Sequence, residues 1–185
     1  MLAVLGLGNP GRAYARSRHN VGFWCVEQVA REHHIPLGER RRHAVLGQGS
    51  IAGLPVVLAK PRTFMNRSGI AARYLAQRFA LRPEQLLVVH DDMDLPLGTL
   101  RLRPRGSSAG HHGLESTMAE LRTQEFLRLR IGVGRPPPGQ DPVGFVLAPF
   151  APGEGQAIRE TVARAAEAVA WLAEHGLESA MNRYN

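Results

Sequence analysis

The stretch LAVLGLGNPGRAYARSRHNVG, residues 2–22, begins with an apolar run and ends where a helix is expected to start. The run Leu2–Leu5 is predicted to be a buried strand that gives way to a loop rich in Gly, Asn and Pro. This loop carries an amide (Asn9), a phenol (Tyr14) and an imidazole (His19). Few structural tasks need all three at the end of one strand, whereas a site that binds a carbonyl group and moves a proton does.

Outward from this stretch, strand patterns alternate with helix patterns along 185 residues, a length typical of one domain. The predicted strands are Leu2–Leu5, His43–Ser50, Pro55–Ala59, Leu86–His90, Thr99–Arg103 and Phe126–Val133. The predicted helices are Val21–Arg31, Asn66–Phe79, Gly113–Arg122 and Glu154–Glu174. The alternation predicts an α/β fold, a single globular domain over residues 1–185 with a central mixed, mostly parallel sheet flanked by helices. Gly134–Pro142 is predicted to be a loop, either a lid or a plain surface connection.

The formal net charge is +7, and Lys60 is the only lysine among 23 basic residues. Arginine forks suit phosphate groups, so this surplus indicates a polyanionic partner such as nucleic acid. Genomic composition bias combined with solubility explains the charge equally well. The single cysteine, Cys25, excludes an internal disulfide, and there is neither a basic leader nor an apolar run of membrane-spanning length. These features predict a cytoplasmic protein outside the membrane.

Two glycine patterns suggest other chemistry. Gly6–Gly11 matches G-x-G-x-x-G, the fingerprint of dinucleotide binding, but no helix opens directly after it and no acidic residue ends a second strand at the required distance. Gly106–Gly110 matches G-x-S-x-G, which would make Ser108 the nucleophile of a serine esterase. Its triad would need Asp141 from a Pro-rich loop and His175 from a helix end. The favoured interpretation is that small residues let backbone amides approach a phosphate or carbonyl.

The run HDDMD, residues 90–94, could be taken for a metal cluster. Neighbours on a strand face opposite sides, so Asp91 and Asp92 would not share an ion, and no second group of ligands with metal spacing follows. We expect Asp91 at the carboxyl end of its strand, where open α/β sheets place their sites and where it could orient a histidine. Asp92 and Asp94 are expected to be turn or surface residues. We predict no metal.

The segment TFMNRSG, residues 63–69, follows a strand and opens a helix. Asn66 could simply be an N-cap, which Asn favours. Phe64 and Met65 are residue types that more often belong to a core than to a ligand site. Only their combination with the loop of Asn9 and His19 makes these residues candidates for substrate binding.

Taken together, these segments resemble the bacterial-type peptidyl-tRNA hydrolases. The matching stretches are GLGNPGRAYARSRHNVGF, KPRTFMNRSG, VVHDDMDLPLGTLRLR, RGSSAGHHGLES, FLRLRIGVGRP, VGFVL and AMNRYN, in family order over nearly the whole chain. The resemblance implies a monomeric enzyme that hydrolyses the ester between a peptide and the 3′ ribose of tRNA. It implies no cofactor. The alternatives are a serine esterase and a non-catalytic RNA-binding relative.

The resemblance also implies roles for individual residues. His19 matches the general base, Asp91 the carboxylate that orients it, and Asn9 the position that separates peptidyl esters from free aminoacyl esters. The expected contacts to the 3′ CCA end or the peptide come from Tyr14, Phe64, Met65, Asn66 and His112, and those to acceptor-arm phosphates from Arg103 and Arg130.

One position departs from the family pattern. The family usually has G-G-H-N-G where this chain has Ala109-Gly110-His111-His112-Gly113, so His112 replaces an Asn that helps to place substrate and water. An imidazole cannot donate and accept from the same atoms as an amide does. His111 matches the family His and is expected only to shape the loop.

Overall fold

The computed structural model describes residues 1–185 and contains one seven-stranded mixed sheet. The strands are β1 (Leu2–Gly6), β2 (Glu39–Arg40), β3 (Ala44–Ile51), β4 (Leu54–Pro61), β5 (Leu86–Asp92), β6 (Leu100–Arg103) and β7 (Leu127–Gly132). The helices are α1 (Val21–Glu32), α2 (Gly69–Arg78), α3 (His112–Leu121), α4 (Pro142–Leu147) and α5 (Gly155–Tyr184). No helix is both long enough and apolar enough to cross a membrane.

The sheet has the order β2-β3-β4-β1-β5-β7-β6. Its central strands β4, β1, β5 and β7 are parallel, whereas β2, β3 and β6 extend the two edges with antiparallel pairs. β3 and β4 form a hairpin whose turn residues, Ala52 and Gly53, both have positive φ, as predicted for a tight connection. This arrangement confirms the α/β fold with a mixed central sheet.

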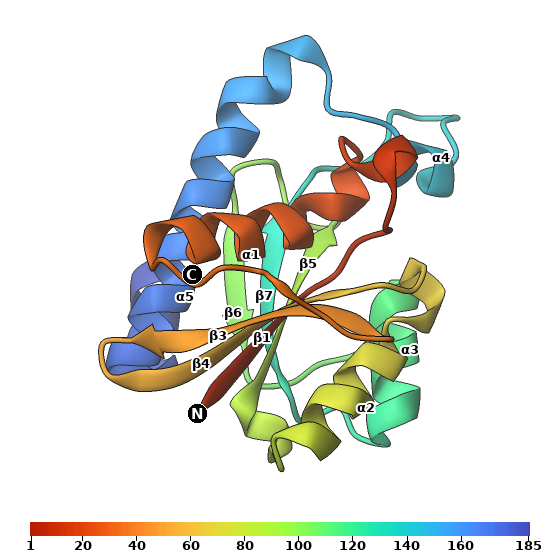
Figure 1. The fold of residues 1–185 in the computed structure, drawn as a ribbon. Coiled ribbons are helices and arrows are strands. Elements are labelled where there is room, and N and C mark those ends of the chain that lie inside the picture. Colours follow the sequence, from red (N-terminus) through yellow and green to blue (C-terminus); the bar gives the residue numbers. More distant parts are fainter.

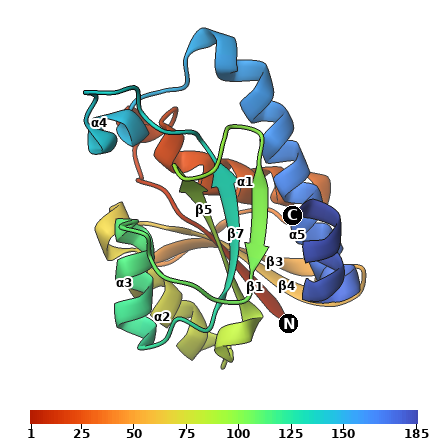
Figure 2. The same cartoon turned by 180° about the vertical axis from the view of Figure 1, so that it is seen from behind.

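Helices cover both faces of the sheet, α1 and α5 on one face and α2 and α3 on the other (Figures 1 and 2). Strand alternation divides the core accordingly. In β1, Val4 belongs to the cluster under α1 and α5, and Leu5 belongs to the cluster under α2 and α3. Strands β1 and β5 therefore present apolar side chains on both faces, which is why Leu2–Leu5 and Leu86–Val89 are unbroken apolar runs.

Glycines bring the start of α1 onto the carboxyl ends of β1 and β5. A Cβ on Gly6 would lie 2.2 Å from the Gly22 oxygen, and one on Gly22 would lie 2.5 Å from the Leu7 and Val89 oxygens. Only Gly allows this approach. The first two glycines of the Gly6–Gly11 pattern, Gly6 and Gly8, thus serve packing against α1, and a 3₁₀ turn follows the pattern where a dinucleotide fold would place a helix.

Besides the unpredicted two-residue strand β2, three segments differ from the sequence prediction. The helix expected from Asn66 is a 3₁₀ turn, Met65–Arg67, followed by α2, and the expected loop at 134–142 leads directly into the unpredicted α4. The last helix runs on to Tyr184 with a break at Gly176, whose φ is 81°. Beyond it, the Asn185 side chain accepts from Leu102 N–H at 2.7 Å and donates to Leu102 O at 3.2 Å, which occupies the outer edge of β6.

Candidate active site

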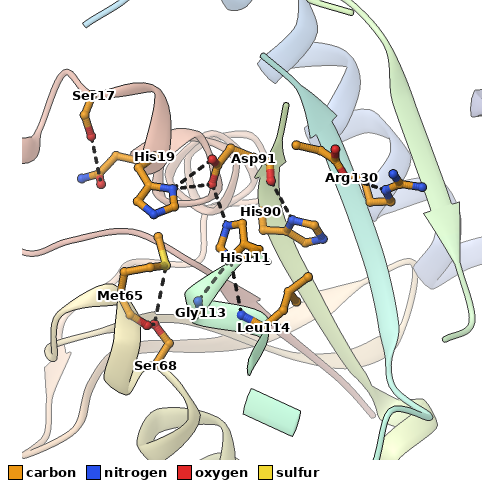
Figure 3. Close-up of polar contacts among 12 residues, drawn as sticks. Ser17, His19, Met65, Ser68, His90, Asp91, His111, Gly113, Leu114 and Arg130 are labelled. Carbon is orange, nitrogen blue, oxygen red and sulfur yellow. Dashed lines mark hydrogen bonds and ion pairs between the residues drawn. The ribbon is translucent and has the colours of Figure 1, made fainter. Parts of the chain in front are cut away.

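Two distant residues meet at the carboxyl ends of the central strands. His19 lies on a short 3₁₀ turn (Arg18–Asn20) before α1, and Asp91 lies near the end of β5. His19 Nδ1 is 2.8 Å from Asp91 Oδ1 and 2.9 Å from Oδ2 (Figure 3). The carboxylate can only accept, so Nδ1 carries the proton and Nε2 keeps its lone pair for the cleft.

Asp91 has a second imidazole partner that the sequence did not predict. His111 Nε2 lies 2.9 Å from Asp91 Oδ1, and its Nδ1 accepts from the N–H groups of Gly113 at 3.1 Å and Leu114 at 3.3 Å. His111 is therefore the N-cap of α3 as well as a partner of Asp91 (Figure 3). The expectation that it merely shapes a loop is wrong, because its ring connects α3 to the carboxylate.

The ligand atoms of His19, Asp91 and His111 lie within 4.8 Å of one another, a spacing that a metal ion could use. However, the amides that donate to His111 Nδ1 leave its proton on Nε2, the atom that faces Asp91. A protonated nitrogen cannot ligate a metal. These residues therefore fit a hydrogen-bonded acid–imidazole cluster better than a metal centre.

The environment keeps Asp91 ionised and its neighbour His90 neutral. Burial alone would raise the pKa of Asp91, but the imidazoles of His111 and His19 outweigh it and hold this pKa well below its usual range. Burial is the main cause that lowers the pKa of His90 to about 3. The His90 ring lies 5.0 Å from the His111 ring, and its Nε2 is buried without a partner.

The Asn9 side chain has a fixed orientation. Its Oδ1 accepts from Met65 N–H at 2.7 Å, while its main-chain N–H and C=O are both bonded by the Asn20 amide, at 2.8 and 2.9 Å. Because a backbone N–H can only donate, Oδ1 must face Met65. The Asn9 Nδ2 group is left as a donor on the cleft side. Asn66, by contrast, is exposed on the cleft wall and does not cap α2, so the N-cap interpretation is wrong.

These groups line a cleft of about 380 Å³. It contains the predicted residues Asn9, Tyr14, His19, Phe64, Met65, Asn66, Asp91 and His112. The Tyr14 and Phe64 rings meet edge to face with centroids 6.0 Å apart, and the Phe64 side chain is largely exposed. Met65 is buried in the core as well, and His112 is an exposed residue at the start of α3.

One apolar wall of the cleft was not predicted from the sequence. It is formed by α4, from which Val143, Val146 and Leu147 line the cleft. Asp141 caps this helix by accepting from Gly144 N–H at 2.8 Å. The pair Asp141-Pro142, an N-cap residue followed by Pro at the first helical position, would have predicted a helix start.

A buried guanidinium holds the other end of α4. Arg18 donates to the oxygens of Phe145 (3.2 Å) and Pro149 (2.6 Å) and forms an ion pair with Glu154 at 2.9 Å. It also lies 4.1 Å above the Phe145 ring. The residue next to His19 thus joins the 3₁₀ turn that carries His19 to the cleft wall.

Arg103 and Arg130 do not line this cleft. With the buried Arg128 they border a neighbouring hollow of about 240 Å³. Arg130 Nε is 2.7 Å from Asp92 Oδ2, and Asp92 is only 8% exposed. The expectation that Asp92 is a turn or surface residue is therefore wrong, because alternation along β5 points Asp92 at Arg130 while Asp91 faces His19. Asp94 lies in a turn, paired with Arg135.

The residues of the alternative serine triad are dispersed. Ser108 lines the cleft, but its Oγ accepts from Gly110 N–H at 3.3 Å. Asp141 caps α4, and the His175 ring stacks on Trp171 with centroids 3.8 Å apart. The geometry assembles an acid–imidazole pair around Asp91 instead.

Comparison with known proteins agrees with this geometry. A family model described as peptidyl-tRNA hydrolase matches residues 3–185. Peptidyl-tRNA hydrolases of Moorella thermoacetica and Chloroflexus aurantiacus are 47% and 46% identical, over 100% of this chain and 98% and 99% of theirs. The crystal structure of peptidyl-tRNA hydrolase from Acinetobacter baumannii matches with a TM-score of 0.94 and 36% identity, covering 100% of this chain and 94% of that one. The resemblance carried by the motifs is confirmed, and the chain belongs to the peptidyl-tRNA hydrolase family.

Proposed function

We propose that this chain hydrolyses the ester between a peptide and the 3′ ribose of tRNA, with His19 as general base. The observation that carries the proposal is the pairing of His19 Nδ1 with both Asp91 oxygens at 2.8 and 2.9 Å, in a cleft that also holds Asn9 and Asn66. Base, orienting acid and amide donors supply each step, so we propose no cofactor. We further propose that residues 1–185 act as a single catalytic domain, as a cytoplasmic monomer.

The reaction needs one proton to be moved twice. His19 Nε2 takes a proton from water as the water oxygen bonds to the ester carbonyl carbon, and Asp91 stabilises the imidazolium that forms. The tetrahedral intermediate then collapses with loss of the ribose 3′ oxygen. That oxygen recovers the proton from His19, giving a tRNA 3′ hydroxyl and a peptide carboxylic acid, which releases its own proton to water. The imidazole is neutral again after each turnover.

Amide groups are suited to the oxygen that becomes negative. The Asn9 Nδ2 donor is fixed by the contact of Oδ1 with Met65, and Asn66 adds a second amide on the same wall. Donors that are already oriented stabilise an oxyanion without reorganisation. We assign to Asn9 the distinction between a peptide bond and a free α-amine, since a charged ammonium would not accept from Nδ2.

Aromatic and basic groups are suited to the tRNA. The Tyr14–Phe64 pair offers an exposed ring face to the terminal base or to a peptide side chain. Arg103 and Arg130 border the hollow beside the cleft, a position suited to acceptor-arm phosphates. Contacts to phosphates do not distinguish between base sequences, so they allow one enzyme to act on many tRNAs.

The test is turnover of N-acetyl-aminoacyl-tRNA in the presence of a chelator. Wild-type protein should release tRNA, and His19→Ala should lower kcat by roughly 10²–10⁴-fold while tRNA binding is retained. Ser108→Ala is the matched control and should remain active. Activity that survives in His19→Ala but is lost in Ser108→Ala would favour the serine esterase. Binding of tRNA without turnover by the wild type would favour an RNA-binding protein.

A further inference from the structure

The arrangement around the Asp91 carboxylate leaves the imidazole of His111 without a role in the reaction. Asp91 Oδ1 is contacted both by His19 Nδ1 at 2.8 Å and by His111 Nε2 at 2.9 Å (Figure 3). The His111 side chain is only 10% exposed, and the Asp91 side chain only 2%. Water therefore has little access to this carboxylate, and the two rings are its main hydrogen-bond donors.

The backbone of α3 decides which nitrogen of His111 carries the proton. Nδ1 accepts from the amides of Gly113 and Leu114, so the ring is a neutral donor through Nε2. Gly113 permits this close approach, because a Cβ there would lie 2.5 Å from the Met65 sulfur and 3.1 Å from His111 itself. The start of α3 thus fixes both the place and the tautomer of His111.

We propose that His111 is a positioning residue that locks the Asp91 carboxylate toward His19 and sets the pH at which His19 gains its proton. This inference rests on the proposed role of His19 as general base. A donor on Oδ1 satisfies part of the anionic charge of Asp91 and leaves less of it to stabilise an imidazolium on His19. It also prevents the carboxylate from turning away from Nδ1.

The other groups around the pair do not replace this donor. His90 packs against the opposite side of His111, but its Nδ1 lies 2.8 Å from the main-chain oxygen of Asp91. Asp92 is paired with Arg130, and Asp94 with Arg135. Arg18 directs its guanidinium to Glu154. Of the charged and titratable side chains that line the cleft, only Tyr14 and the exposed His112 have no hydrogen-bond or ion-pair partner.

Two substitutions separate the donor role of His111 from its capping role. His111→Asn retains a side chain that caps helices well but is too short to reach Asp91. His111→Gln places an amide N–H at about the former position of Nε2 and gives up the cap. We expect His111→Asn to move the acid limb of the kcat/KM profile to higher pH by roughly half to one unit, a fraction of the shift caused by a whole opposite charge. His111→Gln should keep the wild-type acid limb.

The pH at which His19 is half protonated can also be measured without turnover, by NMR titration of its ring protons in the free protein. This measurement stays valid even if the chain has another substrate, so a failure of the proposed function is distinguishable from a failure of this inference. An identical His19 titration in wild type and His111→Asn would reduce His111 to a helix cap. A shift in His111→Gln equal to that in His111→Asn would likewise overturn the donor role.

Discussion

At the scale of single residues, the site depends on amides and imidazoles whose orientation is fixed by the backbone. Asn9 is held by Met65 N–H, and His111 by the first amides of α3. In both cases a group that can only donate decides which atom of the side chain faces the cleft or the carboxylate. Residue types near a strand end therefore become specific donors only after folding.

Asn9→Asp tests this directly, because it preserves an oxygen for Met65 N–H and replaces only the Nδ2 donor. We expect the turnover of N-acetyl-aminoacyl-tRNA to fall by roughly 10²–10³-fold, the usual effect of losing one oxyanion donor. The rate ratio between N-acetylated and free aminoacyl-tRNA should also narrow. Single-turnover hydrolysis of both esters measures this ratio. An unchanged ratio would remove Asn9 from substrate discrimination.

Residue-scale pairing also explains which predictions from the sequence failed. The run HDDMD predicts Asp91 at a strand end, and the family resemblance implies that His19 is its partner. The partnership of Asp92 with Arg130 spans 38 residues and that of His111 with Asp91 spans 20, and neither follows from local propensity. Such pairs depend on strand order and register, which a single sequence does not specify.

At the scale of elements, the strands and the long helices were predictable because their apolar periodicity extends over many residues. The six-residue α4 was not, because it offers too few residues for a periodic pattern and follows a Pro-rich loop. Its stability comes from distant groups, chiefly the Arg18 guanidinium at its carboxyl end. Whether the 134–142 segment acts as a lid stays a prediction.

We expect Arg18→Met to loosen α4. The change keeps apolar contact with Phe145 but removes donors to the oxygens of Phe145 and Pro149, so the free energy of unfolding should fall by about 1–3 kcal/mol. KM should rise as the cleft wall becomes mobile, and limited proteolysis should cut faster between α4 and α5. Glu154→Gln, which retains a hydrogen-bonding oxygen, should have a smaller effect. Wild-type proteolysis rates and KM in Arg18→Met would contradict this account.

At the scale of the whole molecule, the sheet brings its functional groups together at the carboxyl ends of its central strands. His19 and Asp91 meet because Gly6 and Gly22 let α1 contact the sheet at the ends of β1 and β5. The same burial that shapes the site makes stability depend on pH, since His90 is neutral in the folded protein.

In the unfolded chain His90 binds a proton below about pH 6.5, whereas burial lowers its pKa in the folded protein to about 3. The unfolded state thus holds more protons in this window, so the free energy of unfolding falls with falling pH, by up to about 1.4 kcal/mol per unit from this group. His90→Asn should flatten the dependence measured by urea unfolding between pH 7 and pH 5. The exposed His34→Asn is the control and should keep the wild-type slope. Equal slopes in all three proteins would exclude His90 as the cause.

The amide of Asn185 has a consequence for how copies of this protein meet. By imitating a neighbouring strand against Leu102, it occupies hydrogen-bonding groups that β6 would otherwise offer to solvent. An open strand edge is a template for self-association and aggregation. Asn185→Ala should therefore leave hydrolysis at the carboxyl ends of the central strands unchanged. Concentrated solutions of this variant should aggregate more than those of the wild type.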